Sequence, residues 1–220
     1  VATPRWLDEA ELRRADQLIS AFENSTTVLA YDYAENIGDD AGVTTGRAGF
    51  TTKTCDALTV IDRYSTTHPG HRLERFAPEL RRLCAARSGD TTGLPEADYI
   101  VAWQATADDP AFRAVQDAVV HEQYYVPAMR EADRVGVVSP LTRAQIYDTS
   151  VHQGAGNGPA SMQAVVRLTV EQVGTPAQAG EAAWLDRYLT VRTDMLLASG
   201  TKKALTTDRV ASVRRIAATG

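Results

Sequence analysis

Apolar residues recur every three or four positions along most of the chain, a spacing that predicts helices. Near the start, Asp8 and Glu11 have the spacing of a capping box, which predicts that a helix begins there. One apolar face follows it, formed by Leu12, Ala15, Ile19 and Phe22. Glu23 continues this face, so the sequence predicts an amphipathic helix that ends in a carboxylate.

From residue 28 to 50 the pattern changes to alternating, β-prone residues around a Gly-rich turn at 38–42, which predicts a hairpin or a small three-stranded sheet. Helical spacing then returns, interrupted by Gly and Pro, with predicted helices at 56–66, 73–86, 95–106, 110–134, 140–152, 159–173, 180–198 and 207–217. We therefore expect a mainly helical α+β fold over residues 1–220, a single domain with two lobes. The small β-containing lobe lies around 28–50, and a cleft is expected where the sheet meets the helices.

Three charged residues occupy apolar positions of these helical patterns. Asp148 lies seven residues after Leu141, while Arg192 and Arg209 fall among Leu and Val or Ile positions of their own helices. Charged groups are seldom buried without a partner, so these three are expected to meet in the interior. The alternative is that each lies at the solvent-exposed edge of its apolar face, with the long side chains of the two arginines reaching water.

Composition narrows the possible partners. At 220 residues and 44% apolar content the chain can bury a sizeable core, and no apolar run approaches the ~18 residues of a membrane span. A net charge of −5 argues against a nucleic-acid partner and suits a polycation. The first residues lack the features of a signal peptide, so the chain is either a mature form or a protein that is not exported.

Two cysteines, Cys55 and Cys84, are too few for a zinc site, and the four histidines lack metal-ligand spacing. Asp56 has the features of a helix N-cap. If the helices that follow Cys55 and precede Cys84 form a hairpin, the two cysteines meet and can form a disulfide; two buried thiols are the alternative.

Glu23 and Asp39 are the candidate catalytic pair. Two carboxylates held on separate elements can flank one glycosidic bond, where one gives a proton and the other activates water. Partial burial would raise the pKa of Glu23 towards that of a general acid. Each residue also has an ordinary reading, Glu23 as a solvated helix end and Asp39 as a turn residue.

An ordered series of motifs extends along nearly the whole chain. It comprises Phe22 to Ser25, Tyr31 to Asp39, Gly46 to Thr52, Asp56 to Leu58, Pro78 to Leu83, Tyr124 to Met129, Tyr147 to Thr149, Gly154 with Gly156, and Leu189 to Arg192. This series resembles family 46 of the glycoside hydrolases, the chitosanases. The resemblance implies a lysozyme-like two-lobed helical fold with a cleft between the lobes. It also implies endo-hydrolysis of β-1,4-linked glucosamine polymers with inversion, no metal or other cofactor, a monomer, and secretion by a bacterium.

By matching position, the resemblance makes Glu23 the general acid and Asp39 the general base, with Thr44 holding the attacking water. Asp56 matches a residue that binds a glucosamine ammonium. Other positions expected at the substrate are Tyr31, Tyr33, Gln153 and Gly154. A buried ionic network that supports the general acid matches Asp148, Arg192 and Arg209. Carboxylates in the cleft would bind the ammonium groups of the polymer and discriminate against neutral N-acetylated sugars.

The sequence departs from the family pattern at the expected cleft. The segment 40–44 lacks an Arg and a Tyr, and the loop 155–159 lacks the acidic residues common there. Gln153 stands where the family has a substrate-contacting His. Two alternatives therefore stay open: a lysozyme-like hydrolase of another amino-sugar polymer, and a carbohydrate-binding relative without catalysis.

Overall fold

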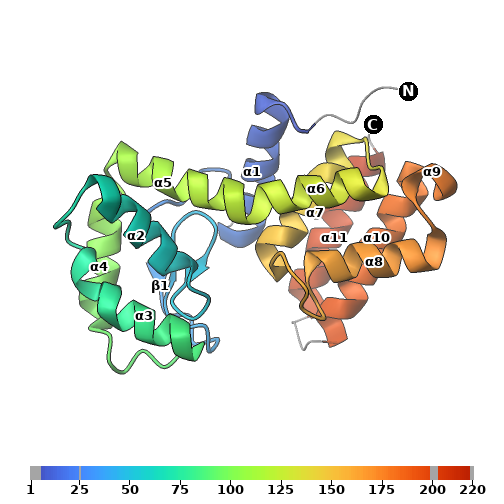
Figure 1. The fold of residues 1–220 in the computed structure, drawn as a ribbon. Helices are drawn as coiled ribbons and strands as arrows, with labels where there is room; N and C mark the ends of the chain where they lie inside the picture. The colour runs from blue at the N-terminus through green and yellow to red at the C-terminus, as the bar shows by residue number, and fades with distance from the viewer. Residues whose placement is uncertain (1–5, 25, 199–202, 219–220) are drawn as a thin grey trace. The chain divides into compact units, whose positions relative to one another are not determined.

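The computed structural model describes residues 6–24, 26–198 and 203–218, without the side chains of 23, 24 and 203–208. It divides the chain into two compact units (Figure 1). The helical unit comprises Val1–Asp16 and Glu122–Gly220, and the sheet unit comprises Gln17–His121. The sheet unit is thus much longer than the 28–50 segment expected from the sequence. The chain passes between the units within α1 (Glu9–Asn24) and within a π-helical turn, η2 (His121–Tyr125).

Three two-residue strands form the antiparallel sheet, in the order β1 (Ala34–Glu35), β2 (Thr44–Thr45), β3 (Phe50–Thr51). The prediction of a small three-stranded sheet is confirmed. Gly42, in the loop before β2, has φ 78°, and a Cβ there would lie 2.2 Å from the Thr52 Oγ1 atom. Only glycine therefore allows this loop to approach the segment after β3 so closely.

The rest of the sheet unit is helical. Its elements are α2 (Asp56–Thr67), the 3₁₀ turn η1 (Glu74–Phe76), α3 (Ala77–Ala86), α4 (Glu96–Thr106) and α5 (Pro110–Val120). Trp103 and Phe112 pack at a centroid distance of 5.0 Å in its core, and both are fully buried. A disulfide joins Cys55, just before α2, to Cys84 near the end of α3. The alternative of two buried thiols is therefore excluded.

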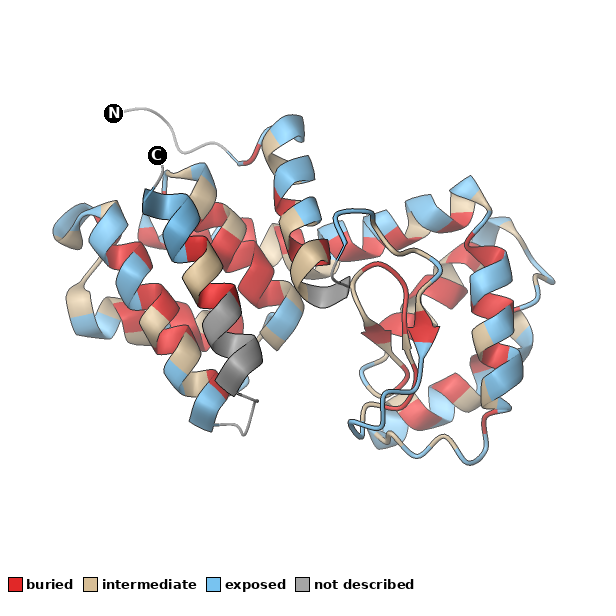
Figure 2. Ribbon diagram, turned by 180° about the vertical axis from the view of Figure 1, so that it is seen from behind, coloured by how far each residue is buried: buried red, intermediate tan, exposed pale blue. Residues whose placement is uncertain are grey.

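The helical unit contains α6 (Val126–Val135), α7 (Pro140–Gln153), α8 (Met162–Val173), α9 (Pro176–Ala179), α10 (Glu181–Ala198) and α11 (Lys203–Ala218). Helix α10 packs against α8, α9 and α11. Its buried residues include Trp184 and Tyr188, whose rings stack 5.4 Å apart. Buried positions recur along the helices of both units, as the apolar periodicity predicts (Figure 2).

Most predicted helices are present, and the differences lie at helix ends and at the breaks between helices. The capping box is confirmed, since the Asp8 N–H donates to Glu11 Oε2 and the Glu11 N–H donates to Asp8 Oδ1, both at 2.8 Å. The predicted helix 110–134 is wrong as a single element because η2 interrupts it between α5 and α6. Within the described residues, no helix combines the length and apolar character needed to cross a membrane.

Candidate active site

Glu23 is the penultimate residue of α1, in its last turn. On the same helix Ala15 and Ile19 are buried, as the predicted apolar face requires. The Ser20 hydroxyl donates to the Val28 carbonyl at 3.0 Å, so this last part of α1 is tied to the segment that follows it. The Glu23 side chain lies outside the described residues, and its role stays a prediction.

Asp39 lies in the loop between β1 and β2, where its side chain is exposed. Its Oδ1 atom accepts from the Ala41 N–H at 3.1 Å, and just before it Asn36 Oδ1 accepts from the Gly38 N–H at 3.0 Å. Short Asn and Asp side chains hold such turns by bonding the backbone two residues on. Two successive turns of this kind fix the loop and leave the Asp39 carboxylate accessible to solvent.

Thr44 opens β2, where it is paired with Glu35 on one side and Thr51 on the other. It is half-buried. Among the residues that the structure describes, none forms a hydrogen bond with its hydroxyl. A hydroxyl on a paired strand has a fixed position and can both donate to and accept from a water molecule.

Tyr33 and Glu35 add an acidic neighbourhood to the same strand region. The Tyr33 hydroxyl donates to Glu35 Oε2 at 3.2 Å. Burial raises the pKa of Tyr33, and the negative charges of Glu35 and Asp39 raise it further. Glu35 therefore lies near the candidate base, although it was not singled out from the sequence. The alternation in β1, with Ala34 buried and Glu35 exposed, is the signal that could have revealed it.

Tyr31 is held by charged groups. Its hydroxyl donates to both carboxylate oxygens of Asp117, at 2.9 and 3.1 Å, and Arg47 Nε lies 3.1 Å from Asp117 Oδ1. The guanidinium carbons of Arg47 and Arg113 lie 6.0 and 5.7 Å from the centre of the Tyr31 ring. Trp103, by contrast, is fully buried and donates its Nε1–H to the Tyr31 carbonyl, so it belongs to the core.

Asp56 corrects one expectation. The N-cap of α2 is Cys55, in the left-handed conformation, and Asp56 is the first helical residue. The Asp56 side chain is buried, and its Oδ1 atom accepts from Thr51 N at 2.8 Å, Thr54 Oγ1 at 2.7 Å and Ala57 N at 3.0 Å. Through these contacts the carboxylate stabilises the connection between β3 and α2. Its contact with a sugar ammonium stays a prediction.

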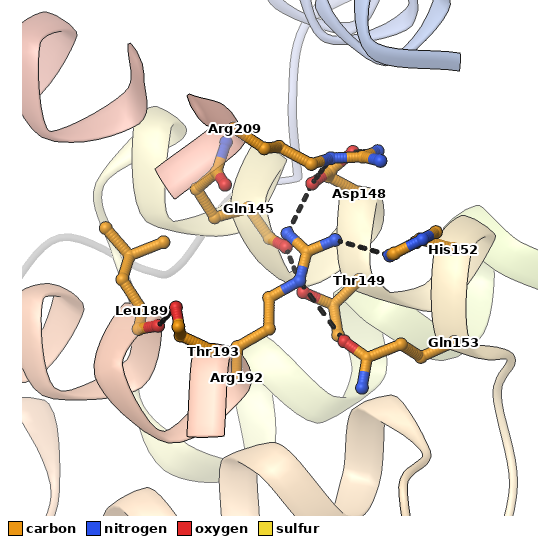
Figure 3. A network of polar contacts seen from close by, with 9 residues as sticks. All are labelled: Gln145, Asp148, Thr149, His152, Gln153, Leu189, Arg192, Thr193 and Arg209. Carbon is orange, nitrogen blue, oxygen red and sulfur yellow. Dashed lines mark hydrogen bonds and ion pairs between the residues drawn. The ribbon is translucent and has the colours of Figure 1, made fainter. Parts of the chain in front are cut away.

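The three charges on apolar stripes do meet, inside the helical unit (Figure 3). Asp148 is fully buried, and both guanidinium groups contact its carboxylate: Arg192 Nη1 contacts Oδ2, and Arg209 Nη2 contacts Oδ1. Arg209 Nε also donates to Oδ2 at 3.1 Å. Burial alone would raise the pKa of Asp148, but the two guanidinium ions outweigh it and hold the pKa well below its usual range.

Gln153, at the end of α7, contacts this network. Its Oε1 atom accepts from Arg192 Nε at 3.2 Å, and its Nε2 donates to the Ala160 carbonyl at 2.8 Å. Gly154 follows with φ 80°, and a Cβ there would have no atom within 4 Å. In the described part of the chain, no group of three or more His, Cys, Asp or Glu residues is arranged to hold a metal ion.

Comparison with known proteins decides the family. The model of glycosyl hydrolase family 46 matches residues 17–220. The chain belongs to glycosyl hydrolase family 46. A chitosanase of Bacillus subtilis (strain 168) is 42% identical over 193 residues, which are 87% of this chain and 69% of that protein. A chitosanase of Streptomyces sp. (strain N174) is 31% identical over 83% of this chain and 66% of its own length.

Solved family 46 structures share the fold. The native chitosanase of Bacillus subtilis MY002 superposes with a TM-score of 0.90 at 40% identity, covering 96% of this chain and 90% of that one. A chitosanase of Gynuella sunshinyii in complex with chitotetraose gives 0.91 at 37% identity, covering 97% and 90%. A mutant of the Bacillus enzyme complexed with 6 GlcN gives 0.87 at 40% identity, covering 96% and 90%. The mainly helical fold with a small antiparallel sheet is therefore that of family 46 chitosanases.

Proposed function

We propose that this protein is an endo-acting chitosanase, which hydrolyses β-1,4-linked glucosamine polymers. The observation that carries this proposal is membership of family 46 together with relatives named chitosanases, one at 42% identity. Solved relatives that bind chitotetraose and 6 GlcN support a glucosamine oligomer as the ligand. A net charge of −5 suits a substrate that carries many ammonium groups.

In the proposed reaction, Glu23 protonates the leaving glycosidic oxygen and Asp39 removes a proton from the attacking water. The exposed Asp39 carboxylate and the Thr44 hydroxyl support this assignment, because both are available to bind water. Water then attacks the sugar face opposite to the leaving group, which inverts the configuration of the anomeric carbon. Inversion requires room for that water, so the two carboxyl groups should lie ~6.5 to 9.5 Å apart when substrate is bound.

We further propose that Asp56 binds a sugar ammonium group and that Tyr31 and Tyr33 contact the sugar rings. The network of Asp148, Arg192 and Arg209 is proposed to support Glu23 between turnovers. The enzyme is proposed to act as a secreted monomer, and the disulfide supports an oxidising, extracellular location.

The test uses a glucosamine hexamer and two variants, Glu23→Gln and Asp39→Asn. Each should keep the wild-type circular dichroism spectrum and lose nearly all turnover, because removing a general acid or base costs roughly 10²- to 10⁴-fold. Asp40→Asn is a matched control, since Asp40 is the neighbouring exposed carboxylate in the same loop. Normal hydrolysis by Glu23→Gln or Asp39→Asn would refute the assignment.

One observation favours a second candidate function. The loop 154–159 carries no charged side chain, so it offers no carboxylate to an ammonium. A partly N-acetylated or other amino-sugar polymer would suit such a neutral loop. Comparing kcat/KM for fully deacetylated and N-acetylated oligosaccharides of equal length separates the two: a preference for the deacetylated series supports the chitosanase, and the opposite preference supports the second candidate.

A further inference from the structure

Arg192 is buried, and each of its three guanidinium nitrogens has a partner (Figure 3). Nη1 contacts Asp148, Nη2 lies 3.3 Å from His152 Nδ1, and Nε lies 3.2 Å from Gln153 Oε1. A guanidinium only donates, so the His152 and Gln153 atoms must both accept. Two of the three nitrogens are thus held by adjacent residues at the end of α7.

The second half of the Gln153 amide faces the loop 154–161, where Nε2 donates to the Ala160 carbonyl at 2.8 Å. This loop is held together by its own hydrogen bonds. Ser161 Oγ donates to the Gly156 carbonyl at 2.6 Å or to the Gly158 carbonyl at 2.8 Å, and the Gly156 N–H donates to Gln163 Oε1 at 2.7 Å. A displacement of the loop would therefore be passed to Gln153 and from there to Arg192.

We propose that Gln153 is a positioning residue, which fixes the Arg192 guanidinium and connects it to the loop 154–161, and that it is not itself a contact of the sugar. Both polar atoms of its amide are already bonded within the helical unit, and this geometry carries the proposal. The consequence for turnover rests on the proposed function, because it assumes that Arg192 supports the general acid.

Three variants separate the two arms of the amide. Gln153→Met keeps the length of the side chain and removes both hydrogen bonds. Gln153→Glu keeps an acceptor for Arg192 and loses the donor to Ala160. Gln163→Met is the matched control, because it removes a tie to the same loop without touching Arg192.

On a glucosamine hexamer, Gln153→Met should lower kcat by roughly 10- to 100-fold with little change in KM, as expected when a supporting group is displaced by about 1 Å. The basic limb of its kcat–pH profile should also move, which a purely structural loss would not cause. Gln153→Glu should recover most of kcat, and Gln163→Met should stay near wild type. A raised KM with unchanged kcat in Gln153→Met would overturn the proposal, since that is the result expected for a sugar contact.

A second readout needs no activity. The Arg192 Nε–H resonance, assigned by its loss in Arg192→Lys, should exchange slowly with solvent in the wild-type protein and in Gln153→Glu, and rapidly in Gln153→Met. Unchanged exchange in Gln153→Met would overturn the proposal. If the wild-type protein fails to hydrolyse the hexamer, the proposed function fails while this measurement still decides the role of Gln153.

Discussion

Replacing Asp148 by Asn tests whether the charge network acts as one buried unit. Asparagine has nearly the same volume as aspartate, so the change removes a charge and leaves the packing nearly intact. Asp148 and Arg192 are each 1% exposed at the side chain, and Arg209 is 9% exposed. Breaking a buried ion pair by removing one partner costs about 3–5 kcal/mol, because the remaining charges stay buried without compensation.

The control is Asp186→Asn, which removes an ion pair of similar geometry at the surface. Arg214 Nε lies 2.8 Å from Asp186 Oδ1, with side chains 45% and 66% exposed. Such a pair contributes about 0.2–1 kcal/mol. Urea unfolding at pH 7, followed by circular dichroism, should therefore show a loss several times larger for Asp148→Asn than for Asp186→Asn. Equal losses would refute the reasoning.

The contribution of Asp148 to stability should also depend on pH, in a direction set by the shift of its pKa. Arg192 and Arg209 hold the folded-state pKa of Asp148 below its unfolded value of about 3.9. The contribution of Asp148 is thus fully present above that value and is lost only as pH falls towards the lower, folded pKa. The stability difference between wild type and Asp148→Asn should stay constant from pH 7 to about 5 and shrink at more acidic pH.

Two further predictions concern the sheet unit. Replacing Cys55 and Cys84 together by Ser should lower the free energy of unfolding by about 3–4 kcal/mol, because the disulfide closes a loop with a sequence separation of 29. A thermal unfolding midpoint equal to that of the wild type would contradict this. Burial lowers the pKa of His71 below its ordinary value of about 6.5, so folding favours the neutral ring. The free energy of unfolding should therefore fall as the pH drops from 7.5 to 5. Urea unfolding of wild type and His71→Gln at several pH values checks this, and an equally steep fall in the variant would contradict it.

Local patterns predicted much of this fold because they report directly on backbone geometry. The capping box of Asp8 and Glu11 and the three-stranded sheet are set by residues close together in sequence. The break between α9 and α10 has a local cause too, since Thr175 and Gln178 form a capping box of their own and Gly180 ends the short helix. No comparable sequence signal marks the π-helical turn at His121–Tyr125, so the helix predicted over 110–134 included it.

In the candidate site, too, some features follow from local sequence patterns and others depend on the tertiary structure. The misfit of charges with apolar stripes was enough to predict that Asp148, Arg192 and Arg209 meet, because burial of an unpaired ion is costly. The partners of Gln153 depend on where α10 and the loop after α7 are placed, which its own neighbours in sequence do not reveal. The sequence predicted Asp56 as the N-cap of α2, but Cys55, one residue earlier and in the left-handed conformation, takes that position.

The most direct test of the proposed chemistry is the configuration of the first product. Time-resolved proton NMR of glucosamine hexamer with wild-type enzyme should show new reducing ends that first appear as the α-anomer and then equilibrate, because inversion at a β-linkage gives α. The Glu23→Gln variant should release almost none. Initial accumulation of the β-anomer would contradict the assignment of Asp39 as a base that activates water, and the absence of any new reducing end with wild-type enzyme would contradict the proposed activity itself.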